Sequence, residues 1–399
     1  MRRPRLRPAR TFAVLLPLVL LAAPAASAAD GSPVRLPVMP SRLDADDACT
    51  GGSAERATSV PWEQQSLQLP RAWQFSAGAG VTVAVVDTGV STAAPALKGR
   101  VKAVGEAGQD CVGHGSFVAG LIASATTDGV RFAGVAQQAR IVAVRGTDAR
   151  GTATAASVAA GIRAAVQAGA TVVEVSPALV QGSAELTAAV EDAVARDALV
   201  VAAAVPDPPA RSSGGSSSGS DDAPEPRAYW PAAQAGVLSV LDVDSTGGRP
   251  DNALVPLDSD LAAPGDGVVG PGPRGSGHYI GSGASFAAGF VAGAAALVRA
   301  AHPGLTAAQV AARLVSTAYP DAVPRLDPYA AVTSVGAVEE GAVGAASGQQ
   351  GPVRLPGDPG ALPTRRAVLV AVGGGAGLLL VVWAAVVVPR GRARGWRAS

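Results

Sequence analysis

Three residues with complementary chemistry occur in the order Asp87, His114 and Ser285; Asp87 follows an apolar run, and His114 and Ser285 lie among small residues. A serine hydroxyl is a weak nucleophile until a base removes its proton, and a histidine oriented by a carboxylate is such a base. Each residue alone also has a structural interpretation, as a turn aspartate, a packed histidine or a serine at a helix start. The combination predicts nucleophilic catalysis by Ser285, with His114 as the base and Asp87 as the residue that orients it.

Ser285 lies in a stretch of small residues, 281–289, that leads into an apolar, Ala-rich segment at residues 290–301. This segment predicts a buried helix with the serine near its start. Small neighbours let a substrate backbone approach closely, and the free N–H groups of a helix start stabilise negative charge beside the serine. His114 precedes a second apolar segment, which predicts a helix at residues 115–124.

The elements that position these residues alternate between strands and helices. Strands are expected where the chain is apolar throughout, at residues 81–86, 141–144, 171–175, 199–204 and 237–243. Helices are expected at residues 154–168, 184–196 and 306–316, the last capped by Thr306. Wholly apolar strands separated by helices predict an α/β fold with a parallel sheet covered on both faces. Ligands bind at the carboxyl ends of such strands, where Asp87 is expected.

Composition and the N-terminus indicate an exported protein. The chain has 399 residues and a net charge of +1, which does not suggest a nucleic-acid-binding protein. A run of arginines precedes an apolar core at residues 12–23, and Ala26-Ser27-Ala28 follows as a small-residue cleavage signal. This pattern predicts a signal peptide at residues 1–28, with an uncleaved membrane anchor as the alternative.

A second uncharged apolar segment, residues 367–388, is long enough to cross a bilayer. More arginines follow it than precede it, which predicts a single-pass cell-membrane protein whose C-terminal tail, residues 389–399, is cytoplasmic. The main domain is then outside the membrane. A buried core helix is the alternative for this segment. The arginines that flank it are Arg365, Arg366, Arg390, Arg392, Arg394 and Arg397.

The remaining segments complete the predicted domain organisation. Residues 29–60 form an N-terminal extension, residues 61–337 the main domain, and residues 338–366 a linker rich in Gly, Pro and Ala. Residues 212–225 are Ser/Gly-rich, then acidic and Pro-rich, and predict a loop within the main domain. The extension is short for an inhibitory domain that folds alone, so we interpret it as a permanent wrap rather than a removable pro-segment.

The chain has two cysteines, Cys49 and Cys111. In an exported protein a disulfide between them is the natural interpretation, and it would tie the extension to the segment just before His114. Two unrelated buried thiols are the alternative. No metal site is expected, because two cysteines and three histidines are scattered along the chain.

Three motifs resemble those of the subtilases. Residues 83–89 (VAVVDTG) are similar to the Asp motif, residues 113–116 (GHGS) to the His motif, and residues 283–288 (GASFAA) to the Ser motif. Further segments resemble mycosins, the membrane-anchored subtilases of type VII secretion systems. These segments are Pro61-Trp62, Asp110-Cys111, Val144-Arg145-Gly146-Thr147, Leu261-Ala262-Ala263-Pro264-Gly265 and Asp327-Pro328-Tyr329-Ala330.

The resemblance implies a subtilisin-like three-layer fold and a serine endopeptidase that needs no cofactor. Ser285 would attack a carbonyl of a protein or peptide substrate, His114 would carry the proton, and Asp87 would hold the imidazole. Components of the type VII secretion membrane complex are the implied partners.

One departure from the family concerns the oxyanion. Subtilases usually follow the strand that corresponds to residues 199–204 with an asparagine that donates to the oxyanion. By register Pro206 takes that position, and a shift of one residue would place Asp207 there; neither residue offers the amide donor. Glu174 stands where the family strand usually has asparagine, and Pro177 interrupts the substrate-binding edge.

These departures leave two functions open. The first is a working but slow or narrow protease. The second is a structural partner in a secretion complex with weak or absent catalysis. A different hydrolase, such as an esterase, is a third and more distant alternative.

Overall fold

Apolar, β-branched segments form the centre of the fold, because such residues favour strands that are buried on both faces. The computed structural model describes residues 35–126, 129–208, 224–249, 253–335 and 361–395. The predicted signal peptide, most of the 212–225 loop and residues 338–360 of the predicted linker lie outside the described residues. The chain divides into two units, residues 1–340 and 341–399, and each is described by itself.

The described part of the first unit contains a seven-stranded parallel sheet in the order β2-β3-β1-β4-β5-β6-β7. At its centre, Val83 of β1 is in register with Ile141 of β3 on one side and Val172 of β4 on the other. Non-consecutive neighbours require helical crossovers, which cover the two faces of the sheet. The strands are β1 (Thr82–Asp87), β2 (Val101–Ala103), β3 (Arg140–Arg145), β4 (Val172–Val175), β5 (Leu199–Ala203), β6 (Val237–Val243) and β7 (Leu261–Pro264).

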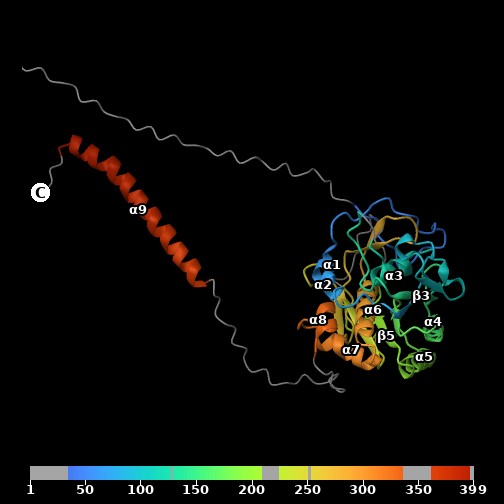
Figure 1. Ribbon diagram of the computed structural model, residues 1–399. Helices are drawn as coiled ribbons and strands as arrows, with labels where there is room; N and C mark the ends of the chain where they lie inside the picture. Colours follow the sequence, from blue (N-terminus) through green and yellow to red (C-terminus); the bar gives the residue numbers. More distant parts are fainter. Residues whose placement is uncertain (1–34, 127–128, 209–223, 250–252, 336–360, 396–399) are drawn as a thin grey trace, which may run out of the picture. The chain divides into compact units, whose positions relative to one another are not determined.

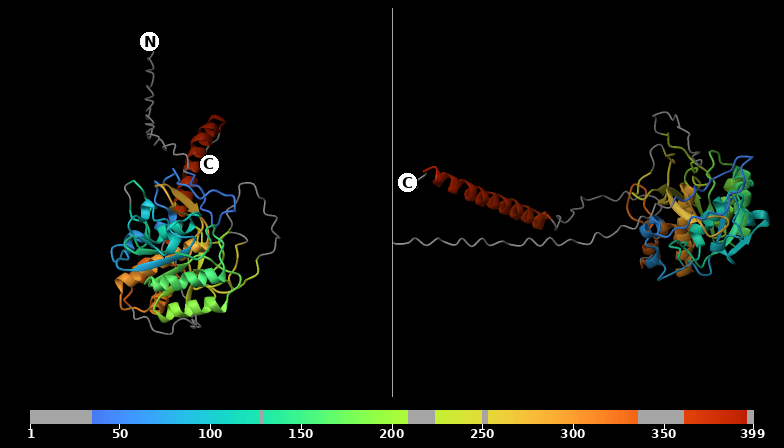
Figure 2. Two further views of the ribbon diagram at one scale, coloured as in Figure 1. Left: turned by 90° about the vertical axis from the view of Figure 1, so that its right-hand side faces the viewer. Right: turned by 90° about the horizontal axis from the view of Figure 1, so that it is seen from above.

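Successive β1 side chains pack into two different cores, one on each face of the sheet. Val83 and Val85 belong to the larger core, and Ala84 and Val86 to the smaller one. The larger core includes residues of α2 (Leu69–Ala72), α3 (His114–Ala123), α6 (Ala284–Ala301), α7 (Ala307–Ser316) and α8 (Pro328–Thr333). The smaller core includes residues of α4 (Ala155–Gln167) and α5 (Ala184–Ala195), which lie side by side (Figures 1 and 2). The result is the predicted three-layer α/β fold.

Short elements complete the first unit. An antiparallel pair, β8 (Val268–Pro271) and β9 (His278–Gly281), lies outside the main sheet. Helix α1 (Trp62–Ser66) precedes α2, and two 3-10 turns, η1 (Pro95–Leu97) and η2 (Gly105–Gly108), lie between β1 and α3.

The five predicted strands and the predicted helices are all present, and most of their bounds agree within one or two residues. The Thr306 cap is confirmed, because its side chain accepts a hydrogen bond from Gln309 N. The predicted helix at residues 290–301 was too short. Helix α6 begins at Ala284, since Ala and Ser in its first turns continue the helix as readily as the apolar residues that follow.

Two helices within the described residues are long and apolar enough to span a membrane. The first is α6, but 83% of its 18-residue window is buried, so it is the central helix of the first unit. The second window, Gly374–Gly391, belongs to α9 (Ala361–Ala393) and is only 6% buried. Helix α9 contains the predicted span at residues 367–388.

Candidate active site

Asp87, His114 and Ser285 meet at the carboxyl end of β1, although they come from three different elements. Asp87 is the last residue of β1, His114 the first of α3, and Ser285 the second of α6. His114 Nδ1 lies 2.7 Å from Asp87 Oδ2, and His114 Nε2 lies 3.1 Å from Ser285 Oγ. All three residues are buried. This geometry allows the imidazole to take a proton from the serine while the carboxylate holds its other nitrogen.

Helix α3 can approach β1 this closely because residue 115 is glycine. A Cβ at Gly115 would lie 2.1 Å from Gly89 O and 3.0 Å from Asp87 Cβ, so a side chain there would push the helix away. The close approach brings His114, the preceding residue, within hydrogen-bonding distance of Asp87.

The start of α3 is also held by Asp110, a residue whose contribution the sequence did not reveal. Its carboxyl group accepts from Gly113 N, Ser116 N, Ser116 Oγ and Thr88 Oγ1, at 2.7–2.9 Å. Burial raises the pKa of Asp110, although these donors oppose the shift. Because Thr88 follows Asp87 directly, Asp110 links the loop after β1 to the helix that carries His114.

Ser285 stands in the first turn of α6, where backbone N–H groups have no partner within the helix. Phe286, the next residue, packs against the rings of His114 and Phe117 at centroid distances of 4.9 and 4.8 Å. This packing fixes the position of the imidazole beside the serine.

A second carboxyl group, that of Asp207, contacts Ser285 from the loop after β5. Asp207 Oδ1 accepts from Ser285 N at 3.1 Å, and Asp207 Oδ2 accepts from Ser285 Oγ at 2.5 Å. Oδ2 also lies 3.0 Å from His114 Nε2. We expected Pro206 opposite the serine, with Asp207 as the alternative. The structure places Asp207 there, one residue later, because the chain runs on beyond Ala203, the last residue of β5, before it turns back to the site.

The two carboxylates determine the charge on the histidine. Burial disfavours a charged imidazole, but Asp87 and Asp207 together outweigh burial and hold the pKa of His114 well above its usual value. Burial likewise disfavours a charge on Asp87, yet the nearby imidazole lowers the pKa of Asp87 below its usual value. The site therefore favours an ionised Asp87 next to a readily protonated histidine.

Glu174 lies in β4, next to β1, and its pKa is shifted in the opposite direction to that of Asp87. It is fully buried, and burial followed by the negative charge of Asp87 raises its pKa well above the usual value. Its Oε1 accepts from Ser176 Oγ at 2.9 Å, and the Ser176 side chain also lowers the pKa of Asp87. Ser176 therefore lies between Glu174 and the carboxyl group that holds His114. Glu174 thus supports Asp87 through Ser176.

The N-terminal extension is fastened beside the site. Cys49 and Cys111 form a disulfide bond, as predicted, and Thr50 N donates to Cys111 O at 2.9 Å. Farther from the disulfide, Met39 N donates to Ile280 O of β9. Since Cys111 follows Asp110, the extension is covalently attached to the loop that positions His114.

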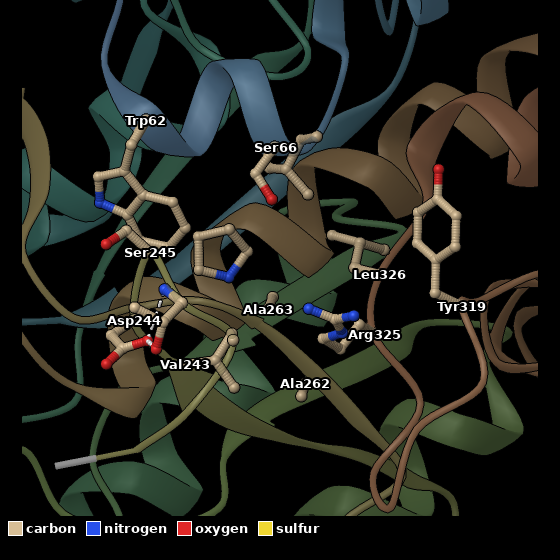
Figure 3. Close-up of a pocket in the computed structure, with 14 residues that line it drawn as sticks. Trp62, Ser66, Val243, Asp244, Ser245, Ala262, Ala263, Tyr319, Arg325 and Leu326 are labelled. Carbon is tan, nitrogen blue, oxygen red and sulfur yellow. Dashed lines mark hydrogen bonds between the residues drawn. The ribbon is translucent and has the colours of Figure 1, made fainter. Parts of the chain in front are cut away.

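A pocket of about 230 Å³ occurs at the ends of β6 and β7 and includes none of the three predicted catalytic residues. Figure 3 shows Trp62 on one side of it and Tyr319 and Arg325 on the other. The Arg325 guanidinium already pairs with Asp321 at 3.2 Å. Among the residues that the structure describes, no group of three or more His, Cys, Asp and Glu side chains could hold a metal ion.

Residues 78–352 match the family model described as the subtilase family. The chain belongs to the subtilase family. It is therefore a serine protease by family, as the sequence motifs predicted.

Relatives of this subtilase include mycosin-3 of Mycobacterium tuberculosis, which is 34% identical in an alignment of 319 residues that covers 65% of this chain and 67% of mycosin-3. A solved structure of MycP3 protease from the type VII (ESX-3) secretion system is 30% identical with a TM-score of 0.58, and covers 75% of this chain and 94% of that one. A chain in the structure of an intact ESX-5 inner membrane complex is 26% identical with a TM-score of 0.62. The match covers 90% of this chain and 97% of that one. The protein is a subtilase related to mycosins.

Among subtilases the residue opposite the serine is usually asparagine, and here it is Asp207. The sequence contained a signal for this, because Asp207 is the first acidic residue after the apolar strand β5. The roles of Asp110 and Ser176 had no comparable signal, since both depend on loops whose path the sequence alone does not define.

Proposed function

We propose that this subtilase is a membrane-anchored serine endopeptidase that cleaves protein or peptide substrates with Ser285 as nucleophile. The observation that carries the proposal is the hydrogen-bonded series Asp87, His114 and Ser285, with contacts of 2.7 and 3.1 Å. Its order along the chain and its strand and helix origins match the subtilase motifs.

In this mechanism Ser285 Oγ attacks the scissile carbonyl carbon while His114 Nε2 takes the hydroxyl proton. Asp87 accepts from Nδ1–H and stabilises the imidazolium that forms. The carbon–nitrogen bond then breaks as His114 returns the proton to the leaving amine. Water, deprotonated by the same imidazole, releases the acyl group and regenerates the serine.

The catalytic proposal is tested by fluorophosphonate labelling of the full-length protein in detergent, from acidic to alkaline pH, with Ser285→Ala as the control. We expect labelling of the wild type that the Ser285→Ala variant lacks. Labelling no greater than that of the variant at every pH would eliminate Ser285 as the nucleophile.

We further propose that α9 anchors the chain in the cell membrane, with the peptidase domain outside and the C-terminal tail in the cytoplasm. The apolar window at Gly374–Gly391 and the arginines that follow it support this orientation. Protease added to intact spheroplasts should digest the domain and spare an epitope tag on the tail. Digestion of the tag with an intact domain would reverse the orientation.

The likeness to a chain of the ESX-5 inner membrane complex supports a corresponding partner, a type VII secretion membrane complex. Affinity purification of the tagged chain from its own membranes, compared with a chain that lacks residues 361–399, tests this proposal. Recovery of type VII membrane components with the full chain is expected. Their absence from it would refute the association.

A structural role without catalysis was the other function left open, and strains distinguish it. If catalysis matters, Ser285→Ala should reproduce the secretion defect of a deletion strain. Normal secretion by Ser285→Ala, together with a defect in the deletion strain, would instead favour the structural role.

A further inference from the structure

The carboxyl group of Asp207 occupies the place where a subtilase needs a hydrogen-bond donor. Its Oδ1 accepts from Ser285 N at 3.1 Å, so it uses the helix-start N–H that an oxyanion beside Ser285 would use. Its Oδ2 accepts from Ser285 Oγ and lies 3.0 Å from His114 Nε2. The Ser285 N–H that would bind an oxyanion is therefore already occupied by Asp207.

The space for this carboxyl group comes from Gly283, the residue before α6. A Cβ at Gly283 would lie 2.0 Å from Asp207 Oδ1 and 2.3 Å from its Cγ. The Asp207 side chain is only 8% exposed. The fit is thus specific to a glycine at 283 and a buried side chain at 207.

An aspartate in this place can act in two opposite ways, depending on whether its carboxyl group carries a proton. Without a proton it offers no donor, repels an oxyanion and holds the Ser285 hydroxyl hydrogen. With a proton its O–H becomes a donor, and a neutral carboxylic acid in an enzyme site is an effective oxyanion donor. The chemistry of the site therefore depends on where one proton resides.

His114 Nε2 and Asp207 Oδ2 lie 3.0 Å apart, so one proton can pass between them. With two protons on the pair, His114 cannot act as a base. With none, Asp207 is a carboxylate that opposes the oxyanion. With one, the form in which Asp207 carries the proton and the imidazole is neutral has both the donor and the base. Catalysis requires the singly protonated pair.

The other ionisable groups around the pair come from β1, β4 and β6. Asp87 favours the proton on His114. Glu174 and Asp242 both interact electrostatically with Asp207, and the charge of Asp242 is balanced by Arg249 at 2.9 Å. None of these groups contacts Ser285 directly, so Asp207 is the group that connects the proton to the reacting atoms.

We propose that Asp207 is a catalytic residue of this protease, which donates a hydrogen bond to the oxyanion when protonated and blocks the site when ionised. The inference rests on the proposed function of Ser285. During attack the bond from Oγ to the carbonyl carbon forms, the hydroxyl proton moves to His114, and the carbonyl electron pair moves to oxygen. Asp207 donates to that oxygen and keeps its proton when the carbon–nitrogen bond breaks.

The test measures the rate at which a fluorophosphonate labels Ser285 in the full-length protein as pH is varied. The wild type should give a bell-shaped profile, because labelling is lost when the pair gains or loses a proton. Asp207→Asn should lose the alkaline limb and reach a plateau about 10²- to 10³-fold above the wild type at alkaline pH, since its amide donates at every pH. Its acid limb should move to lower pH, because His114 loses a partner that stabilises its charge.

Two further variants separate the blocking carboxylate from the missing donor. Asp207→Ala removes the carboxylate and supplies no donor. Its pH profile should therefore also lack the alkaline limb, but its plateau should lie about 10²-fold or more below that of Asp207→Asn. Asp242→Asn removes a nearby buried carboxylate without placing an amide at Ser285, and it should keep the bell shape. Circular dichroism of each variant checks folding.

A wild-type profile with no alkaline limb would overturn the inference, whether or not the variants fold. Equal plateaus of the labelling rate for Asp207→Asn and Asp207→Ala would also overturn the inference. In either case Ser285-dependent labelling would leave the proposed protease function intact. Labelling of Ser285→Ala equal to that of the wild type and of Asp207→Asn would instead refute the proposed function.

Discussion

Asp87 and Glu174 lie on the neighbouring strands β1 and β4, and their side chains experience similar burial but opposite electrostatics. Asp87 is 1% exposed and Glu174 is 0% exposed. Burial alone would raise the pKa of both, yet the pKa of Asp87 is lowered and that of Glu174 is raised well above its usual value. The difference is the imidazole of His114, which pairs directly with Asp87. For these two carboxyl groups, the imidazole partner rather than depth in the fold decides the direction in which the pKa is shifted.

Two other buried carboxyl groups extend the comparison. Glu63 and Asp110 also have raised pKa values because burial outweighs the hydrogen bonds they accept. Neutral donors are therefore weaker than a charged imidazole at keeping a buried carboxylate ionised. Direct pairing with His114 thus distinguishes Asp87 from Glu63, Asp110 and Glu174.

The largest effect should come from Asp87→Asn, which removes the charge but keeps the shape. The amide cannot stabilise the imidazolium or enforce the tautomer, and the analogous change in another serine protease lowers turnover about 10⁴-fold. Fluorophosphonate labelling of Ser285 measures the loss. Glu185→Gln, at the surface, is the control and should label normally. A loss below tenfold would mean that the partner charge is unimportant.

The next effect concerns Glu63, whose pKa is raised from 4.5 to about 7 by burial. The folded protein holds this proton more tightly than the unfolded chain, so the free energy of unfolding should fall as pH rises from 4.5 to about 7. The two pKa values differ by about 2.5, so the loss attributable to Glu63 is about 3 kcal/mol.

Glu63→Gln should remove this part of the pH dependence. Urea unfolding at several pH values, followed by tryptophan fluorescence, measures it. Glu106→Gln, which alters an exposed carboxylate, should leave the slope of the free energy of unfolding against pH unchanged. A Glu63→Gln variant with the slope of the wild type would show that Glu63 is ionised in the folded protein.

A smaller effect is expected from Asp110→Asn. The amide can accept at one oxygen only, and its NH₂ must face either Gly113 N or Ser116 N, so one backbone donor loses its partner. The expected destabilisation is about 1–3 kcal/mol. Thermal unfolding measures it, with the exposed Asp148→Asn as a comparison. A variant as stable as the wild type would show that the loop after β1 is held without Asp110.

The smallest effect should come from Glu174→Gln. Burial and the negative charge of Asp87 raise the pKa of Glu174 well above its usual value and so favour its neutral form. The amide therefore replaces one neutral group with another, and its oxygen can still accept from Ser176 Oγ. Labelling of Ser285 and the midpoint of thermal unfolding should change little, by less than about 1 kcal/mol in either free energy. A tenfold change in the rate of labelling would contradict the inference that Glu174 is neutral while Asp87 is ionised.

Much of the fold was predictable from the sequence because most residues of its central strands are apolar, and hydrophobic runs bounded by turns reveal strands directly. The helix that begins at His114 was predicted for a similar reason. Strands β2, β7, β8 and β9 were missed because each has only three or four residues and includes Lys, Pro or Gly, which are uncommon in strands. The first turns of α6 were missed because small residues fit both a loop and a helix.

The candidate site was predictable in part. The motifs around Asp87, His114 and Ser285 predicted that these residues come together, and their distances agree with that expectation. The residue opposite Ser285 was assigned one position early, because strand register does not define the path of the turn that follows β5. Asp110 was not predicted as a support, since its donors are backbone groups brought to it by loop geometry.

The disulfide between Cys49 and Cys111 has a consequence for any cleavage of the extension. The two cysteines are 62 residues apart. A single cut anywhere between them yields two pieces that remain covalently joined, with residue 49 still attached beside the loop that carries Asp110. Such a cut would change the mobility of the chain on a reducing gel only. Proteolysis after residue 49 alone therefore cannot release the extension, and its departure requires a reductant as well.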